Sequence, residues 1–191
     1  MWVGPAYEYG KLDSVLKTES KKFEFVSGRL QEIDSLSSSF VSQPGTARHV
    51  PPAFLGDEKD FPFVLTTYQP VLTMENGSQN YPWAQEIFLA MHGLGWNSFA
   101  ELNAETAHEL GIENLDEVWV ESPFGRLKVK ARVTEWIRPE MVAIARGQGH
   151  YAPGEWQKGM GVNPNDIVGV DYDRLSGQSA LFNTRVKVYK A

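Results

Sequence analysis

The 191-residue chain contains no cysteine, and it has only four histidines. The absence of cysteine excludes disulfides, thiolate zinc sites and iron–sulfur clusters held by this chain itself. The four histidines are too scattered along the sequence to predict a metal site. Any redox function of the chain must therefore use electrons carried by a ligand or by a partner protein.

Long apolar segments and an excess of positive charge are also lacking. No segment approaches the roughly 20 apolar residues of a transmembrane helix. Pro5, Lys11 and Asp13 interrupt the start of the chain, so that no targeting signal is predicted. We expect no direct membrane insertion, and another chain would carry this one to a membrane. The 18 basic and 24 acidic residues give a net charge of -6, which disfavours nucleic-acid binding.

The composition is that of a folded protein. The hydrophobic fraction is 42%, with six tryptophans, seven tyrosines and ten phenylalanines, and disordered chains are poor in such residues. The length suits one domain of ordinary size. We predict that residues 1–60 form an irregular N-terminal connector arm, with at most a short strand at residues 23–26. Residues 61–191 are predicted to form the folded domain.

Hydrophobic periodicity predicts a mainly β fold with short helices, of the α+β class. Asn103 can cap a helix that Gly111 ends. Residues 147–179 lack periodicity and are rich in glycine, so they form either a long ordered loop or a disordered segment. Ordered loops of that length are usually functional. Strands are predicted at residues 63–68, 117–121, 126–133, 141–145 and 186–189, and helices at residues 82–89 and 103–111.

Several groups of side chains allow two interpretations. Four basic residues at strand spacing form either a solvated face or a surface for an acidic partner. Trp119, inside a predicted strand, is expected in the core. The polar residues Asp171, Asp173 and Ser176 either face a ligand or cap a turn. The four basic residues are Arg126, Lys128, Lys130 and Arg132.

Two glycine-rich motifs occur near the end of the chain. They are Gly-Gln-Gly-His-Tyr at residues 147–151 and Gly-Met-Gly-Val-Asn-Pro at residues 159–164. Glycines this dense after an apolar run allow the backbone to approach a large ligand closely. They follow a Leu-Thr-Thr-Tyr strand at residues 65–68 and a helix and strand at residues 101–121. This order resembles the C-terminal cofactor-capping domain of molybdopterin oxidoreductases related to dimethyl sulfoxide reductase.

Within that family, the two motifs resemble those of polysulfide, thiosulfate and tetrathionate reductases. They also resemble the molybdopterin-like subunits of the menaquinone reductase complex and of alternative complex III. The resemblance implies a double-psi β-barrel that contributes to the binding of molybdopterin guanine dinucleotide in an oxidoreductase of anaerobic, respiratory electron transfer. The isolated chain is not expected to be catalytic, because the resemblance places the metal-ligating residue in other domains.

The resemblance leaves an alternative open, since some molybdopterin-like subunits are thought to have lost the pterin. The chain would then be a cofactor-less structural part of a membrane-associated, quinone-reducing complex. An independent small β-barrel with an unrelated ligand is a third hypothesis. The partners implied by the resemblance are the remaining domains or subunits of the oxidoreductase, an iron–sulfur subunit and a membrane quinone-reactive subunit. The implied location is peripheral, on the periplasmic side of a membrane-bound complex.

The resemblance assigns eight cofactor-binding residues and no catalytic or metal-binding residue. Relatives usually carry an arginine where this chain has Gln69, and an amide lacks the charge with which a guanidinium binds phosphate. A histidine-rich stretch is also missing from residues 71–80. His150 either donates to a pterin or its phosphate or pins its own loop, and Asn163 either binds a pterin or guanine edge or forms a turn. The eight candidates are Thr66, Thr67, Tyr68, Gln69, Gly149, His150, Asn163 and Arg185.

Overall fold

The computed structural model describes residues 9–31, 49, 51–71, 77–93, 95–151, 155–173 and 176–191. The chain separates into two compact units, residues 1–51 and residues 52–191. In the first unit, the described residues form a short 3-10 helix, η1 (Leu12–Ser14), and one helical turn, α1 (Gly28–Gln31). The strand considered at residues 23–26 does not form; Phe23 and Phe25 instead pack edge to face, with ring centroids 4.9 Å apart. Much of the predicted connector arm lies outside the described residues.

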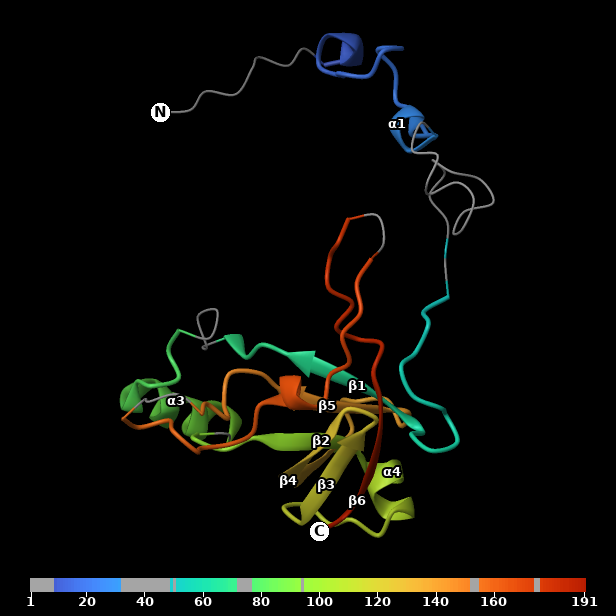
Figure 1. Ribbon diagram of the computed structural model, residues 1–191. Coiled ribbons are helices and arrows are strands. Elements are labelled where there is room, and N and C mark those ends of the chain that lie inside the picture. Colours follow the sequence, from blue (N-terminus) through green and yellow to red (C-terminus); the bar gives the residue numbers. More distant parts are fainter. Residues whose placement is uncertain are drawn as a thin grey trace. The chain divides into compact units, whose positions relative to one another are not determined.

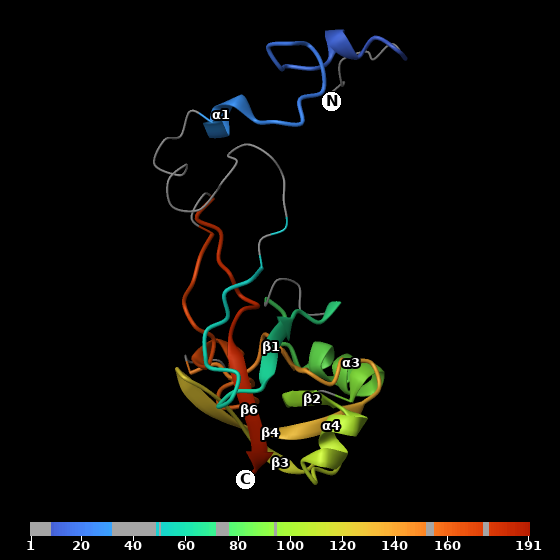
Figure 2. The same cartoon turned by 90° about the vertical axis from the view of Figure 1, so that its right-hand side faces the viewer.

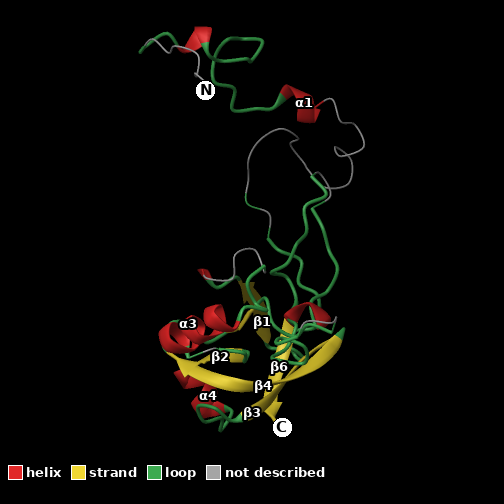
Figure 3. Cartoon of the chain, turned by 90° about the vertical axis from the view of Figure 1, so that its left-hand side faces the viewer, coloured by secondary structure: helices red, strands yellow, loops and turns green. Residues whose placement is uncertain are grey.

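The second unit is built on a closed six-stranded barrel (Figures 1 and 3). The strands follow one another around the barrel in the order β1-β5-β2-β4-β3-β6. This confirms the prediction of a mainly β fold with short helices. The strands are β1 (Phe63–Tyr68), β2 (Phe99–Asn103), β3 (Glu117–Ser122), β4 (Gly125–Thr134), β5 (Met141–Ala145) and β6 (Arg185–Lys190).

Two strand pairs of the barrel are parallel, β1 with β5 and β2 with β4. The remaining neighbours are antiparallel, and β6 closes the barrel between β1 and β3. In the first parallel pair, Val64 lies opposite Met141 and Tyr68 lies opposite Ala145. The carboxyl ends of β1 and β5 therefore meet at one rim of the barrel.

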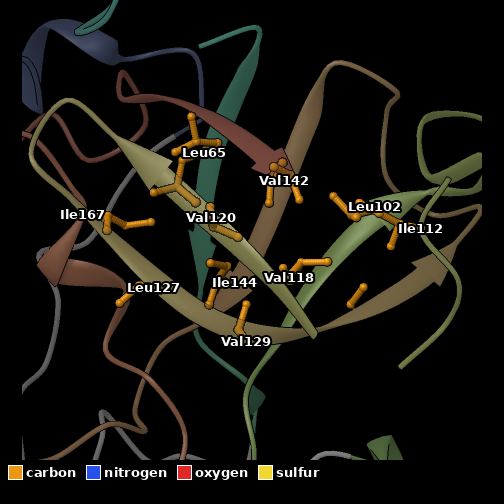
Figure 4. Close-up of a cluster of buried hydrophobic side chains, with 14 of the residues drawn as sticks. Leu65, Leu102, Ile112, Val118, Val120, Leu127, Val129, Val142, Ile144 and Ile167 are labelled. Atoms are coloured by element: carbon orange, nitrogen blue, oxygen red, sulfur yellow. The ribbon is translucent and has the colours of Figure 1, made fainter. Parts of the chain in front are cut away.

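Branched aliphatic side chains from all six strands fill the barrel (Figure 4). The predicted alternation in β4 is confirmed, since Leu127 and Val129 are buried while Arg126, Lys128 and Lys130 are exposed. The prediction that Trp119 lies in the core is wrong. Val118 and Val120 occupy the inner face of β3, so Trp119 faces outward, and the guanidinium of Arg126 lies 4.5 Å from its ring centroid.

Three of the helices in the described part of the second unit lie between its strands. Helix α3 (Pro82–His92) has proline at its first turn and ends at Gly93 in the left-handed conformation. Helix α4 (Ala104–Glu109) begins at Asn103, whose side chain accepts a hydrogen bond from the Glu105 amide, and it packs beside β2 and β4 (Figure 2). The predicted proline start of the first helix and asparagine cap of the second are therefore confirmed. The third is a 3-10 helix, η3 (Pro164–Asp166), after the second glycine-rich motif.

The two glycine-rich motifs pack against each other. The Gly149 amide donates to the Met160 carbonyl at 2.8 Å, and His150 pairs with Lys158 as an isolated parallel bridge. A Cβ atom on Gly149 would lie 2.2 Å from the Asn163 nitrogen. At this position the missing side chain thus allows the contact between two loop segments.

The packing of Gly149 predicts that its replacement by alanine disrupts the loops. Gly159→Ala is the matched control, because Gly159 has a similar positive φ angle, with no atom near the Cβ position. Both substitutions incur the left-handed strain of about 1–2 kcal/mol, and Gly149→Ala should add roughly 1–3 kcal/mol for the overlap. Urea unfolding of the chain measures the free energy of unfolding of both variants. Equal losses of unfolding free energy in the two variants would contradict the close contact at Gly149.

Glu121 on β3 links this strand to the closing strand β6. Its carboxylate accepts from the Tyr189 hydroxyl at 2.6 Å and pairs with the Lys187 ammonium at 3.0 Å. The Tyr189 hydrogen bond, followed by the one from Lys187, lowers the pKa of Glu121 below its ordinary value. The folded state therefore binds fewer protons than the unfolded state, and stability is lost as the pH falls through the ordinary carboxylate range and below it.

We predict that Glu121→Gln makes the melting temperature less sensitive to pH between about pH 5 and about pH 3. Glu135→Gln is the control, because Glu135 is exposed and makes no side-chain hydrogen bond or ion pair with the described residues. Calorimetric melting of the three proteins across this range makes the comparison. If Glu121→Gln and Glu135→Gln lose stability in parallel on acidification, the link to β6 has no role in the pH response.

Candidate functional site

A cavity of about 430 Å³ opens where β5 ends beside β1. The Arg146 amide donates to the Tyr68 carbonyl at 2.8 Å, so the parallel pairing continues to the last residue before the glycine-rich loop. The size is typical of sites for small molecules and cofactors. The cavity is lined by Arg146, Gly147, Gln148, Gly149, His150, Tyr151, Asn163 and Asn165.

The lining carries one permanent positive charge and no carboxylate. Its other polar groups are amides, one imidazole, one phenol and the backbone of Gly147 and Gly149. Two of the side chains have buried atoms without a hydrogen-bond partner in the structure, the Arg146 Nε and the Gln148 Oε1. Buried polar groups are normally paired, so this part of the lining holds one donor and one acceptor that lack their usual partners.

A chain of buried glutamines holds Gln148 in place. The Gln148 Nε2 donates to the Gln85 Oε1 at 3.0 Å, and the Gln85 Nε2 donates to the Gln79 carbonyl at 2.7 Å. Gln79 and Gln85 are each only 1% exposed. The Gln148 nitrogen is used toward Gln85, and its oxygen is left buried without a hydrogen-bond partner.

His150 pins the first glycine-rich loop. Its Nε2 lies 2.9 Å from the Gly147 carbonyl. A carbonyl oxygen can only accept, so Nε2 must carry a proton in this contact. Of the two interpretations of His150, the structure therefore shows the loop-pinning contact, while the same ring also lines the cavity.

Asn163 and Tyr151 shape the other wall. The Asn163 side chain accepts from the Asn165 amide at 3.1 Å and so begins η3. The Tyr151 hydroxyl donates to Asp166, and this hydrogen bond raises the pKa of Tyr151 above its ordinary value. The Asp166 carboxylate is thereby bound to the phenol of the lining.

The predicted cofactor-binding residues fall into three groups. Gly149, His150 and Asn163 come together in the cavity lining. Tyr68 ends β1 and Gln69 follows it, beside Arg146. Thr66 and Thr67 lie further back within β1, and Thr67 is buried.

Two of the predicted residues are engaged in contacts within the domain. The Tyr68 hydroxyl donates to Glu101 at 2.8 Å, and burial together with Glu101 raises the pKa of Tyr68 well above its usual range. Arg185 pairs with Val64 near the other end of β1, where its guanidinium lies 3.0 Å from the Glu58 carboxylate. Arg185 is not among the residues that line the cavity.

The sequence interpretation missed Arg146 and Gln148. The signal for Arg146 was present, because a cation directly follows the apolar strand that leads into the first glycine-rich motif. Gln148 could be found only through the fold, since its partner Gln85 is 63 residues away. Asp173 caps a turn by accepting from the Ser176 amide at 2.6 Å, whereas Asp171 accepts from the side-chain amide of Asn183 at 2.8 Å.

The described residues contain no group of three or more histidine, cysteine, aspartate or glutamate side chains placed to hold a metal ion. None of the described helices has the length and apolar character needed to span a bilayer.

Comparison with known proteins shows similarity along the whole chain. The family model described as "Molydopterin dinucleotide binding domain" matches residues 63–185. The chain is 32% identical over its full length to the arsenate respiratory reductase molybdopterin-containing subunit of Shewanella sp. strain ANA-3. It is 34% identical, over 95% of its length, to the corresponding subunit of Chrysiogenes arsenatis. The chain spans only 25% of the length of each of these two relatives.

Two further proteins are similar to this chain. The menaquinone reductase, molybdopterin-binding-like subunit of Nitratidesulfovibrio vulgaris is 29% identical to this chain. The matched region covers 51% of this chain and 14% of that subunit. Among solved structures, acetylene hydratase from Pelobacter acetylenicus matches 91% of this chain and 24% of its own chain, with a TM-score of 0.65 and 19% identity. The last match concerns the fold alone, and it agrees with the barrel described above.

The family model covers the barrel from its first strand to the start of its last, including the cavity lining. The expected family, function and cofactor are therefore confirmed at the level of the domain, and the cofactor-less alternative is not favoured. The chain belongs to the molybdopterin-dinucleotide-binding domain family of molybdopterin oxidoreductases.

Proposed function

We propose that this domain caps a molybdopterin guanine dinucleotide in a respiratory oxidoreductase and helps to assemble its catalytic subunit. The observation that carries the proposal is the cavity at the joined ends of β1 and β5, within the part of the chain that matches the family. We further propose that residues 1–60 contain the connector to the other domains.

The donor set of the cavity fits this cofactor. A dinucleotide carries negative phosphates and amide-like pterin and guanine edges, which need cationic donors, neutral donors and acceptors. The lining supplies the Arg146 guanidinium, the Asn163 and Gln148 amides and glycine backbone, without a carboxylate. The free Arg146 Nε and Gln148 Oε1 are the groups expected where part of a ligand is to bind.

The contribution of the domain is to bind and orient. When bound, the cofactor supplies the metal-centred redox chemistry. The chain's own residues hold the loop geometry: His150 ties residue 147 to residue 150, and the Gln85 contact fixes the Gln148 amide. Asn163 begins η3 and presents its side chain at the cavity wall, so its two proposed roles are compatible.

The substrate class is proposed from the relatives that match along nearly the whole chain. Both are subunits of arsenate respiratory reductases, and we propose that the complete protein reduces an oxyanion of this kind. An iron–sulfur subunit and a membrane quinone-reactive subunit are the proposed partners, with this domain peripheral to the membrane on its periplasmic side. The names of the relatives support a molybdopterin-containing subunit within a larger enzyme.

We also propose that the barrel is of the double-psi type. Its two parallel pairs, β1 with β5 and β2 with β4, flank the antiparallel pair β5 and β2. The antiparallel pair β3 and β6 lies on the other side of the ring. This arrangement supports a barrel composed of two related halves.

The proposed function predicts that the intact protein contains the dinucleotide. Oxidation of the purified protein should release a fluorescent pterin, and acid hydrolysis should release GMP, each at about one equivalent or more per protein, as expected for a tightly held cofactor. The same protein from cells that cannot make molybdopterin is the control. Absence of both products from protein made by molybdopterin-competent cells would contradict the proposal and favour a structural role.

A further inference from the structure

We propose that Arg146 is a phosphate anchor for the dinucleotide, an inference that rests on the proposed function. Arg146 lies immediately after β5 and lines the cavity. Its Nε is buried without a hydrogen-bond partner in the structure. A guanidinium is always charged and presents its donors in a planar fork that matches phosphate oxygens.

The other described arginines of the second unit all have a carboxylate or aromatic partner, and Arg146 differs from them in this respect. Arg132 pairs with Glu101, Arg138 with Glu140, and Arg185 with Glu58. The guanidinium of the remaining one, Arg126, packs over the Trp119 ring. Within the described part of the domain, Arg146 alone of these arginines has neither a carboxylate nor an aromatic partner, although its Nε is buried. Arg146 as a whole is only partly exposed, and a guanidinium in such a position is favoured by an anionic partner. An anion of a bound ligand would supply that partner.

The position of Arg146 is fixed by the barrel. Its amide is bonded to the Tyr68 carbonyl, and Gly147 turns the chain away immediately afterwards with a φ angle of 111°. The adjacent strand end carries Gln69, an uncharged amide. The positive charge at this rim of the barrel therefore comes from Arg146, the residue that follows β5. The Asp166 carboxylate, which lies next to the lining residue Asn165 in the chain, accepts a hydrogen bond from Tyr151.

The test compares Arg146→Gln and Arg146→Lys with the matched control Arg138→Gln in the intact oxidoreductase. Arg138 is an exposed arginine paired with Glu140. The measurements are the GMP and pterin content of the purified proteins and the rate of cofactor release at increasing salt. Arg146→Gln should release cofactor on the order of 10- to 100-fold faster, the loss expected for hydrogen bonds to a charged group. Its release should also depend less on salt, because screening acts on the missing charge.

Arg146→Lys should show an intermediate rate, because it keeps the charge and loses the fork. Arg138→Gln should behave as the original protein. Unchanged content, rate and salt dependence in Arg146→Gln would overturn the assignment while leaving the proposed function intact. Unchanged nucleotide binding with weaker association of the domains would also overturn it, since Arg146 would then pair with a carboxylate of the rest of the protein. Absence of nucleotide from the original protein would instead contradict the proposed function.

Discussion

The parallel pairing of β1 with β5 is the constraint on which the site depends. Its register places Tyr68 opposite Ala145, and the hydrogen bond from the Arg146 amide to the Tyr68 carbonyl extends it by one residue. Two segments separated by about 70 residues in sequence thus end at one rim of the barrel. The cavity and its only permanent charge lie at that rim, so the barrel determines where a ligand can be bound.

The loops around the cavity are held by contacts of their own. Gly149 allows the backbone of residues 162–163 to come close, and His150 binds the carbonyl of Gly147. A further chain of hydrogen bonds connects Gln148 to Gln85 at helix α3. These contacts pre-organise the lining, which reduces the ordering that a ligand would otherwise have to impose on binding.

The sequence predicts the strands well where local pattern and burial agree. The alternation of β4 and the asparagine cap of α4 depend on nearby residues and are confirmed. The strand β2 was missed because Phe-Ala-Glu-Leu-Asn is short and only partly β-branched or aromatic, and its extended form depends on pairing with β4 and β5. The core assignment of Trp119 failed although Val118 and Val120 already defined the inner face. The contact of Gln148 with Gln85 depends on tertiary structure and could not be predicted locally.

The most direct test of the account is an experimental structure of the intact, cofactor-loaded protein. We predict dinucleotide density at the rim formed by β1 and β5, with a phosphate oxygen within hydrogen-bonding distance of the Arg146 guanidinium and a pterin or guanine edge near Asn163. The result that would contradict it is a dinucleotide bound at the opposite end of β1, near Arg185, with the cavity at residues 146–151 filled by another part of the protein.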